Sequence, residues 1–326
     1  MESKVAKNTL NCRVLSVSLQ GNCAAIAQLL QRQILAAMNL SAMGMTVADL
    51  SCGVTLTPET IPLQRLPDDT PIIYRSAIAF KLAPVWQLPA LDIANQLTAS
   101  LLASCENPLA QMYIDFNVEV VSPGWINFRL NEQSLATWLQ RLIQMPLRAD
   151  PVDDSSLKLQ KREVKGDKRL TDTPNYFPVQ YAHARCCSLL RLAHRQGLIT
   201  LKDLDFNTLG WQVIEPNPIP WLNDDQKADT EQVVLRLQHP AERRLIAQII
   251  DLPDFLNSPD RLRAVKLAST LSKAFEPFYS SCRIWGEVKT QTPKLAQARL
   301  GLVEVTRGVL RSLLQDQLGV PAPVEL

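Results

Sequence analysis

The sequence has little glycine, little net charge and no long apolar run. Glycine accounts for 11 of the 326 residues and proline for 22, which favours helices joined by stiff, defined loops. The formal net charge is +2, so the chain as a whole lacks the strongly basic signature of many nucleic-acid-binding domains. No apolar run approaches the roughly 18 residues that a membrane span needs, and residues 1–20 contain no signal-peptide core. We therefore expect a cytoplasmic protein without membrane contact.

Residues that commonly bind metals or carry out catalysis are also sparse. The seven cysteines include no C-x-x-C pair, the spacing that zinc fingers and ribbons need, so we expect buried, reduced thiols. The three histidines are His183, His194 and His239, and no glycine-rich phosphate loop is present. His183 is the one candidate general base, and it is expected on the polar side of a helix. The sequence thus predicts no catalytic residue, no cofactor and no metal site.

The first part of the chain predicts a small α+β domain over residues 1–145. Apolar periodicity indicates helices near residues 22–39, 88–105 and 132–145. Residues 117–130 predict a β-hairpin, because two β-rich runs flank Ser122-Pro123-Gly124. Residues 72–82 fit either a helix or a strand, and residues 51–71 are expected to be irregular.

Residues 146–176 are predicted to link two domains. Within residues 158–169 there are six basic and two acidic side chains, a local net charge of +4. Such a run either contacts phosphates without sequence preference or forms a solvated, flexible linker.

Residues 177–326 predict an all-helical bundle, so the fold class is mostly α with a small α+β domain before it. Residues 177–191 read FPVQYAHARCCSLLR, with Val179, Ala182 and Cys186 at helical spacing and Tyr181 and Arg185 between them. Three more helices are expected after His239-Pro240, Ser258-Pro259 and Thr292-Pro293.

Residues 198–229 are expected to form an ordered loop that carries Trp211 and Trp221. Large rings in a loop either dock on their own domain or face a partner. The loop is therefore also the candidate contact for a protein partner.

The string Val-Gln-Tyr-Ala-His-Ala-Arg at residues 179–185 is the one that opens the DALR anticodon-binding domain of arginyl-tRNA synthetases. FEPFYSSCRI and ARLGLVEVTRGVLRSLLQDQLGV, further along the chain, resemble later motifs of that domain. Pro-Gly-x-Ile-Asn-Phe-Arg-Leu at residues 123–130 is similar to the end of the family's amino-terminal additional domain. The resemblance implies a DALR-type bundle over residues 177–326, after an additional domain over residues 1–145.

The sequence departs from the family at several positions. In the family a tyrosine and an asparagine three residues later touch the D-loop of tRNA; Tyr74 matches the tyrosine, but Ala77 replaces the asparagine and cannot hydrogen-bond a base. The family's terminal Arg-Met is replaced by Glu325-Leu326. No His-x-Gly-His or Lys-Met-Ser-Lys-Ser string appears, and about 30 residues between the two domains cannot hold a nucleotide-binding fold. The chain is therefore predicted not to be an enzyme.

Three functions remain open. The first is a non-catalytic arginyl-tRNA synthetase paralogue that binds tRNA or another structured RNA, with no DNA partner expected. The second is a protein-interaction module that kept the fold and lost RNA binding, with Trp211, Trp221 and Trp285 as anchors. The third is the tRNA-binding part of a split ligase. Stacking and phosphate contacts in the first case are assigned to seven residues: Tyr74, Arg75, Tyr181, Arg185, Tyr279, Arg283 and Arg307.

Overall fold

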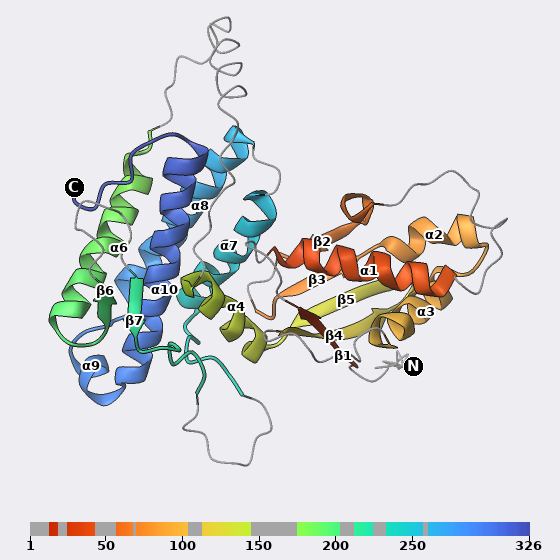
Figure 1. Cartoon of the computed structure of the whole chain (residues 1–326), viewed down its shortest axis with the longest axis horizontal. Helices are drawn as coiled ribbons and strands as arrows, with labels where there is room; N and C mark the ends of the chain where they lie inside the picture. Colours follow the sequence, from red (N-terminus) through yellow and green to blue (C-terminus); the bar gives the residue numbers. More distant parts are fainter. Residues whose placement is uncertain are drawn as a thin grey trace, which may run out of the picture. The chain divides into compact units, whose positions relative to one another are not determined.

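A computed structural model describes most of the chain (Figure 1). The described residues are 13–18, 25–42, 57–67, 70–103, 113–144, 175–202, 212–223, 233–256 and 260–326. The chain divides into two compact units, Met1–Trp138 and Leu139–Leu326, and the division falls inside helix α4 (Glu132–Gln144). The predicted linker lies outside the described residues up to position 174, and so does Trp211. The domain limits at 145 and 177 stay predictions.

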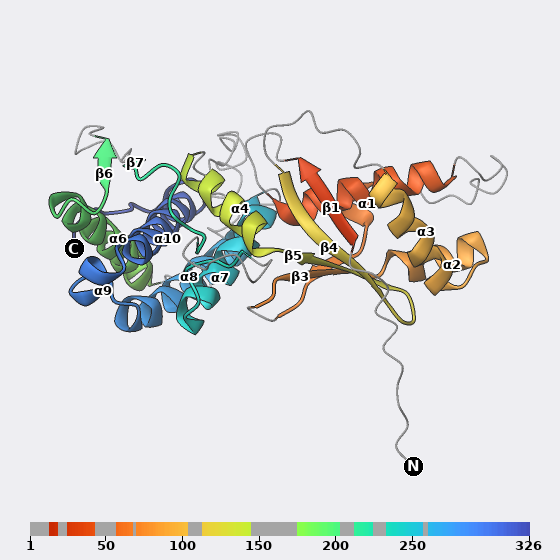
Figure 2. The same ribbon diagram turned by 90° about the horizontal axis from the view of Figure 1, so that it is seen from below.

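The first unit is built on a five-stranded antiparallel sheet with the strand order β1-β4-β5-β3-β2. Helices α1 and α3 pack against each other and against the sheet, and they lie on the same side of it (Figure 2). The elements of this unit, besides α4, are β1 (Arg13–Ser18), α1 (Ile26–Ala42), η1 (Pro58–Thr60), β2 (Leu63–Arg65), β3 (Ile73–Ser76), α2 (Ile78–Trp86), α3 (Ala90–Ala103), β4 (Tyr113–Val121) and β5 (Trp125–Leu130).

The predicted hairpin is confirmed. Strands β4 and β5 pair in register from Val121 opposite Trp125 to Phe116 opposite Leu130. Gly124 closes the turn with φ 153°, and a Cβ there would lie 2.8 Å from the Cβ of Ala90, so the turn needs glycine on both counts. The ambiguous segment at residues 72–82 contains both possible structures, β3 and then α2. The stretch predicted to be irregular contains the short strand β2.

The second unit is a helical bundle around α10, and the prediction of a mostly α fold is confirmed. Helix α10 packs against α6, α7 and α8, and it is buried around most of its circumference, as expected for a helix at the centre of a core. The elements are α6 (Phe177–Arg195), β6 (Thr200–Lys202), β7 (Gln212–Glu215), α7 (Pro240–Leu256), α8 (Arg261–Ser281), α9 (Glu287–Gln291), α10 (Pro293–Ser312) and a final π turn, η2 (Leu313–Gln317).

The helix starts agree only in part with the sequence signals. The His239 Nδ1 accepts from the Ala241 backbone N–H at 3.2 Å and so caps α7. Helix α8 is capped by Asp260, whose side chain accepts from Leu262 N–H, while the predicted Ser258-Pro259 start lies outside the described residues. Helix α10 begins at Pro293 directly after Thr292, as predicted, but the Thr292 side chain makes no cap bond. Its hydroxyl instead donates to the Val288 carbonyl in the last turn of α9.

Two segments without long helices pack on the bundle. The Trp221 indole, 3% exposed, donates to Gln140 Oε1 at 3.0 Å and lies over Gly301 of α10. Residues 319–326 run along α6, where Gln180 donates to the Pro321 carbonyl at 2.9 Å. In the described part of the chain, no helix combines the length and the apolar character that crossing a lipid bilayer requires.

Candidate functional site

The second unit has an open pocket of about 620 Å³ beside α6 and the C-terminal end of α8. Among the described residues that line it, two are arginines and none is an aspartate or glutamate. It contains three of the seven residues that the sequence assigned to RNA contact. The lining residues are Arg185, Ser188, Leu189, Leu192, Phe278, Tyr279, Ser280, Cys282, Arg283, Ile284 and Trp285.

Arg185 and Tyr279 join the two helices across this pocket. The guanidinium carbon of Arg185 lies 4.6 Å from the centroid of the Tyr279 ring, within the range of a cation–π contact. An Nη atom of Arg185 also donates to the Tyr279 hydroxyl. Phe275, one turn earlier on α8, stacks on the Tyr279 ring with centroids 6.2 Å apart. The tyrosine ring therefore contacts both an aromatic ring and a guanidinium group.

Tyr181 extends this surface along α6. It precedes Arg185 by four residues, so both side chains lie on the same side of the helix. Its side chain is 52% exposed and stacks with Phe177, 58% exposed, at a centroid separation of 6.3 Å. We call Phe177, Tyr181, Arg185, Tyr279 and Arg283 the aromatic–arginine surface.

Phe177 and Trp285 belong to this region, but the assignment of RNA contacts from the sequence omitted them. Phe177 stands four residues before Tyr181, a spacing that places both rings side by side on a helix. That spacing was a usable signal. Trp285 lines the pocket because the chain turns back after α8 ends, and helical periodicity does not predict that turn.

Two of the predicted RNA contacts are buried. Tyr74 is 1% exposed in the core of the first unit. Arg307 is buried on α10, where its guanidinium donates to both carboxylate oxygens of Glu304 at 2.8 and 2.7 Å. A side chain enclosed in this way cannot touch an RNA ligand unless the fold opens.

Arg75 is half-buried on the sheet of the first unit. Its guanidinium carbon lies 5.5 Å from the Trp125 ring centroid, and its Nε donates to Asn127 Oδ1 at 2.9 Å. The remaining predicted contact, Arg283, is exposed at the rim of the pocket.

His183 is not on the polar side of α6, so that expectation is wrong. The imidazole is 0% exposed, and its Nδ1 lies 2.9 Å from the Pro323 carbonyl oxygen, which only accepts. Burial lowers the pKa of His183 to about 4; the carbonyl opposes this shift, and Arg307 and Arg311 add to it. The ring is therefore neutral at pH 7 and closed to solvent, unlike a surface base.

The three cysteines within the described residues are free and buried: Cys186, Cys187 and Cys282. Burial raises the pKa of Cys187 to about 11 and, together with the nearby Glu242 carboxylate, that of Cys282 to about 12. These thiols stay protonated and unreactive, as expected for packing residues. Among the described residues, no three His, Cys, Asp or Glu side chains are grouped so as to hold a metal ion.

One known domain family matches the C-terminal part of the chain. The DALR anticodon binding domain family matches residues 219–326. The chain carries a DALR-type domain at its C-terminal end. This DALR-type domain contains part of the aromatic–arginine surface, namely Tyr279 and Arg283, while α6 precedes the matched range.

The curated relatives are arginine–tRNA ligases. The enzyme of Synechococcus sp. (strain JA-3-3Ab) is 34% identical over 160 residues, 48% of this chain and 23% of that protein. That of Moorella thermoacetica is 37% identical over 156 residues, 47% of this chain and 22% of that protein. That of Heliobacterium modesticaldum is 35% identical over 179 residues, 54% of this chain and 26% of that protein. The resemblance to arginyl-tRNA synthetases is confirmed, and the chain spans about a quarter of the length of these relatives. No solved structure gave a significant match.

Proposed function

We propose that this chain binds unpaired nucleotides of a structured RNA, with tRNA as the first candidate, through the aromatic–arginine surface. The observation that carries the proposal is the Arg185–Tyr279 contact near an exposed Tyr181. The described residues that line this pocket include two arginines and no carboxylate. The match to an anticodon-binding family and the names of the relatives support a role connected with tRNA.

The chemistry of the surface suits single-stranded RNA. Unstacked bases bind proteins by stacking on aromatic rings or on guanidinium planes, and each stacked base contributes about 1–3 kcal/mol. Arg283 is exposed at the rim, so its guanidinium is available to a phosphate. A base-paired helix would offer neither its base faces nor the flexibility to enter a pocket of this size.

The proposal keeps four of the predicted contacts in the second unit and adds one. Tyr181, Arg185, Tyr279 and Arg283 remain, and Phe177 joins them. Tyr74 and Arg307 are left out as direct contacts because they are buried. Arg75 stays as a proposed contact of the first unit, where Trp125 and Asn127 hold its guanidinium in place.

We also propose that the chain does not aminoacylate tRNA by itself. The family that matches it is an anticodon-binding family rather than a catalytic one, and the relatives are about four times the length of the matched part. The remaining alternative, the tRNA-binding part of a split ligase, predicts that arginylation appears only when a second chain is added. An arginylation assay with and without cell extract separates the two.

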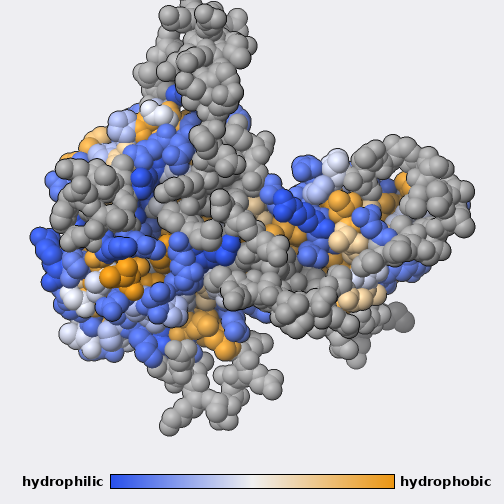
Figure 3. All heavy atoms as spheres, viewed as in Figure 1, coloured by the Kyte–Doolittle hydropathy of each residue, from blue (hydrophilic) through white to orange (hydrophobic). Residues whose placement is uncertain are grey.

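The alternative of a protein partner on the Trp211/Trp221 loop gains no support. Trp221 is inside the second unit, and Trp211 lies outside the described residues. On the face drawn in Figure 3, apolar side chains form small separate patches in a largely hydrophilic surface. The coloured part of this face therefore presents no single large apolar interface.

A binding titration of the full chain tests the proposal. We expect binding of tRNA at about 50 mM salt, weaker binding at about 200 mM, and much weaker binding of an RNA duplex of equal length. Arg185→Ala should weaken tRNA binding at least fivefold. Arg261→Ala is the matched control, because this exposed arginine lies at the opposite end of α8 from Tyr279. No binding at about 50 mM salt, or equal loss in both variants, would overturn the proposal.

A further inference from the structure

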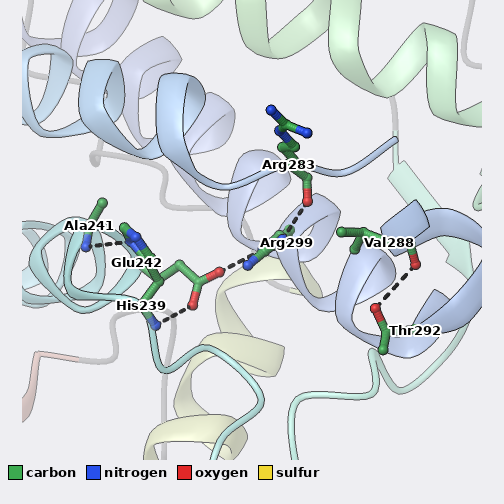
Figure 4. A network of polar contacts seen from close by, with 7 residues as sticks. All are labelled: His239, Ala241, Glu242, Arg283, Val288, Thr292 and Arg299. Atoms are coloured by element: carbon green, nitrogen blue, oxygen red, sulfur yellow. Dashed lines mark hydrogen bonds and ion pairs between the residues drawn. The ribbon is translucent and has the colours of Figure 1, made fainter. Parts of the chain in front are cut away.

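A buried carboxylate is connected, through one arginine, to the backbone at the rim of the pocket. Glu242, in the first turn of α7, is 0% exposed. One carboxylate oxygen accepts the His239 backbone N–H at 2.8 Å and thereby completes the cap of α7. The other accepts the Nε–H of Arg299 at 2.6 Å (Figure 4). Both oxygens of the carboxylate are therefore satisfied inside the bundle.

Arg299 connects this carboxylate to the pocket. It lies on α10 with its side chain 11% exposed, and one of its Nη atoms donates to the backbone carbonyl of Arg283. Figure 4 shows that the Arg283 carbonyl points toward Arg299 while the Arg283 side chain extends the other way. A single guanidinium thus spans from a buried anion to the backbone of a residue at the pocket rim.

The backbone held in this way is irregular. Helix α8 ends at Ser281, and α9 begins at Glu287 after Gly286, which has φ 67°. Residues 282–286 therefore lack the repeating hydrogen bonds of a helix, although they carry Arg283 and Trp285 into the pocket lining. A fixed contact to one carbonyl in such a segment restricts where its side chains can point.

We infer that Glu242 and Arg299 are positioning residues, which fix residues 282–286 so that Arg283 faces RNA. The inference rests on the proposed function. Neither residue touches the RNA: Arg299 acts through the Arg283 carbonyl, and Glu242 acts through Arg299. Arginine suits the task because its rigid fork donates to two acceptors in fixed directions. Lysine is a point charge on a flexible stem and cannot reproduce both contacts.

A cycle of variants in the full chain tests this inference by RNA binding. Arg283→Ala should weaken tRNA binding about tenfold and should reduce the salt slope of log K by about 0.7, the value for one lost phosphate contact on a single strand. In an Arg299→Lys background, Arg283→Ala should cause little further loss. In a Glu304→Gln background, Arg283→Ala should still weaken tRNA binding about tenfold. Glu304 belongs to another buried ion pair of the same helix, with Arg307, and does not hold the Arg283 carbonyl. Equal effects in both backgrounds would overturn the inference.

A second measurement does not depend on RNA. Amide hydrogen exchange of residues 282–286 should be faster in Arg299→Lys, and in Glu242→Gln, than in a Glu304→Gln variant of similar stability. If the wild-type chain binds no RNA but this difference is present, the RNA proposal fails and the anchoring of the segment stands. If the segment exchanges equally in all three variants, the positioning role is wrong, whatever the RNA result.

Discussion

Two sides of α6 carry polar residues that the sequence does not distinguish, and the structure gives them opposite surroundings. On one side Tyr181 is exposed, and Arg185 is half-buried beside Tyr279. On the other, His183 is enclosed against the C-terminal segment. Each residue of a helix turns about 100° from the last, so two residues 2 positions apart point in nearly opposite directions. Polar residues at every second position of a helix, such as Tyr181, His183 and Arg185, therefore lie on two opposite sides. Here one side lines the pocket and the other is part of the core.

The same contrast separates two arginines. Arg185 is half-buried and lines the pocket, where its guanidinium contacts Tyr279. Arg307 is in the core, where the carboxylate of Glu304 takes up its hydrogen bonds. On this central helix the glutamate three residues before the arginine pairs with it in the core, so an arginine in a sequence is no evidence of a binding surface until its neighbours are known.

The largest effect should come from breaking that buried pair. Arg307→Met removes one partner and leaves the Glu304 charge inside the bundle, which typically costs about 3–5 kcal/mol. Denaturant unfolding should therefore show a loss of that size. The folded fraction should still bind RNA with unchanged affinity, because Arg307 is part of the core and not of the surface. Arg261→Met, at an exposed position, should change stability by less than about 0.5 kcal/mol. If Arg307→Met lowered the free energy of unfolding by less than about 1 kcal/mol, Arg307 would not be a buried, paired arginine that differs from Arg185.

His183 should give the second largest effect, as a pH dependence of stability. The pKa is about 4 in the folded chain against 6.5 ordinarily, so the unfolded chain binds the proton more tightly between these values. The free energy of unfolding should thus fall as the pH drops from about 6.5 to about 4, by about 3 kcal/mol for this group. Urea unfolding at several pH values measures it.

Carboxylates also titrate in this range, so the comparison must be made with a variant. His183→Gln keeps a hydrogen-bonding side chain and lacks the titration. The difference in stability between wild type and variant should change across pH 4 to 6.5 and stay constant above pH 7. A constant difference over the whole range would mean that His183 is not held neutral by burial.

Two glycines of α10 compare a tightly packed position of the helix, Gly301, with an open one, Gly308. A Cβ at Gly301 would lie 2.7 Å from the Trp221 ring and 2.9 Å from Ile219, so Gly301→Ala should displace that segment and lower stability by about 1–3 kcal/mol. Gly308→Ala meets nothing within 4 Å and should raise stability by up to about 1 kcal/mol through helix propensity. Thermal or chemical unfolding measures both stability changes. If both variants changed stability in the same direction, the two positions would not differ in packing as the structure shows.

The sequence predicted the parts of the fold that depend on local pattern. Apolar periodicity gave the long helices, and β-rich runs around Pro123-Gly124 gave the hairpin. Strands β1 and β2 were missed because their partners, β4 and β3, are recognised only in the folded chain. The loop predicted at residues 198–229 likewise contains the paired strands β6 and β7, which the sequence did not predict. The C-terminal segment packs along α6 through hydrogen bonds between residues about 140 positions apart. No local sequence pattern predicts this contact.

The candidate site shows the same limit. The letters of α6 pointed to Tyr181 and Arg185, and the motif FEPFYSSCRI pointed to Tyr279 and Arg283. That these four residues lie near one another follows from the packing of α6 against α8. Sequence periodicity could not distinguish these accessible residues from the buried Tyr74 and Arg307. Whether a side chain is buried depends on which other helices and strands cover its side of the element.

The smallest and most specific effect concerns the ring of Tyr181 in the proposed RNA surface. Tyr181→Leu removes the aromatic face and keeps an apolar side chain, so tRNA binding should weaken about five- to tenfold, the equivalent of one lost stacking contact. Tyr181→Phe keeps the ring and its stack with Phe177, and it should bind as wild type does. Because the side chain is more than half exposed, neither change should alter stability by more than about 0.5 kcal/mol. If Tyr181→Phe lost as much affinity as Tyr181→Leu, the hydroxyl rather than the ring would make the contact, and the outer side of α6 would bind by hydrogen bonding instead of stacking.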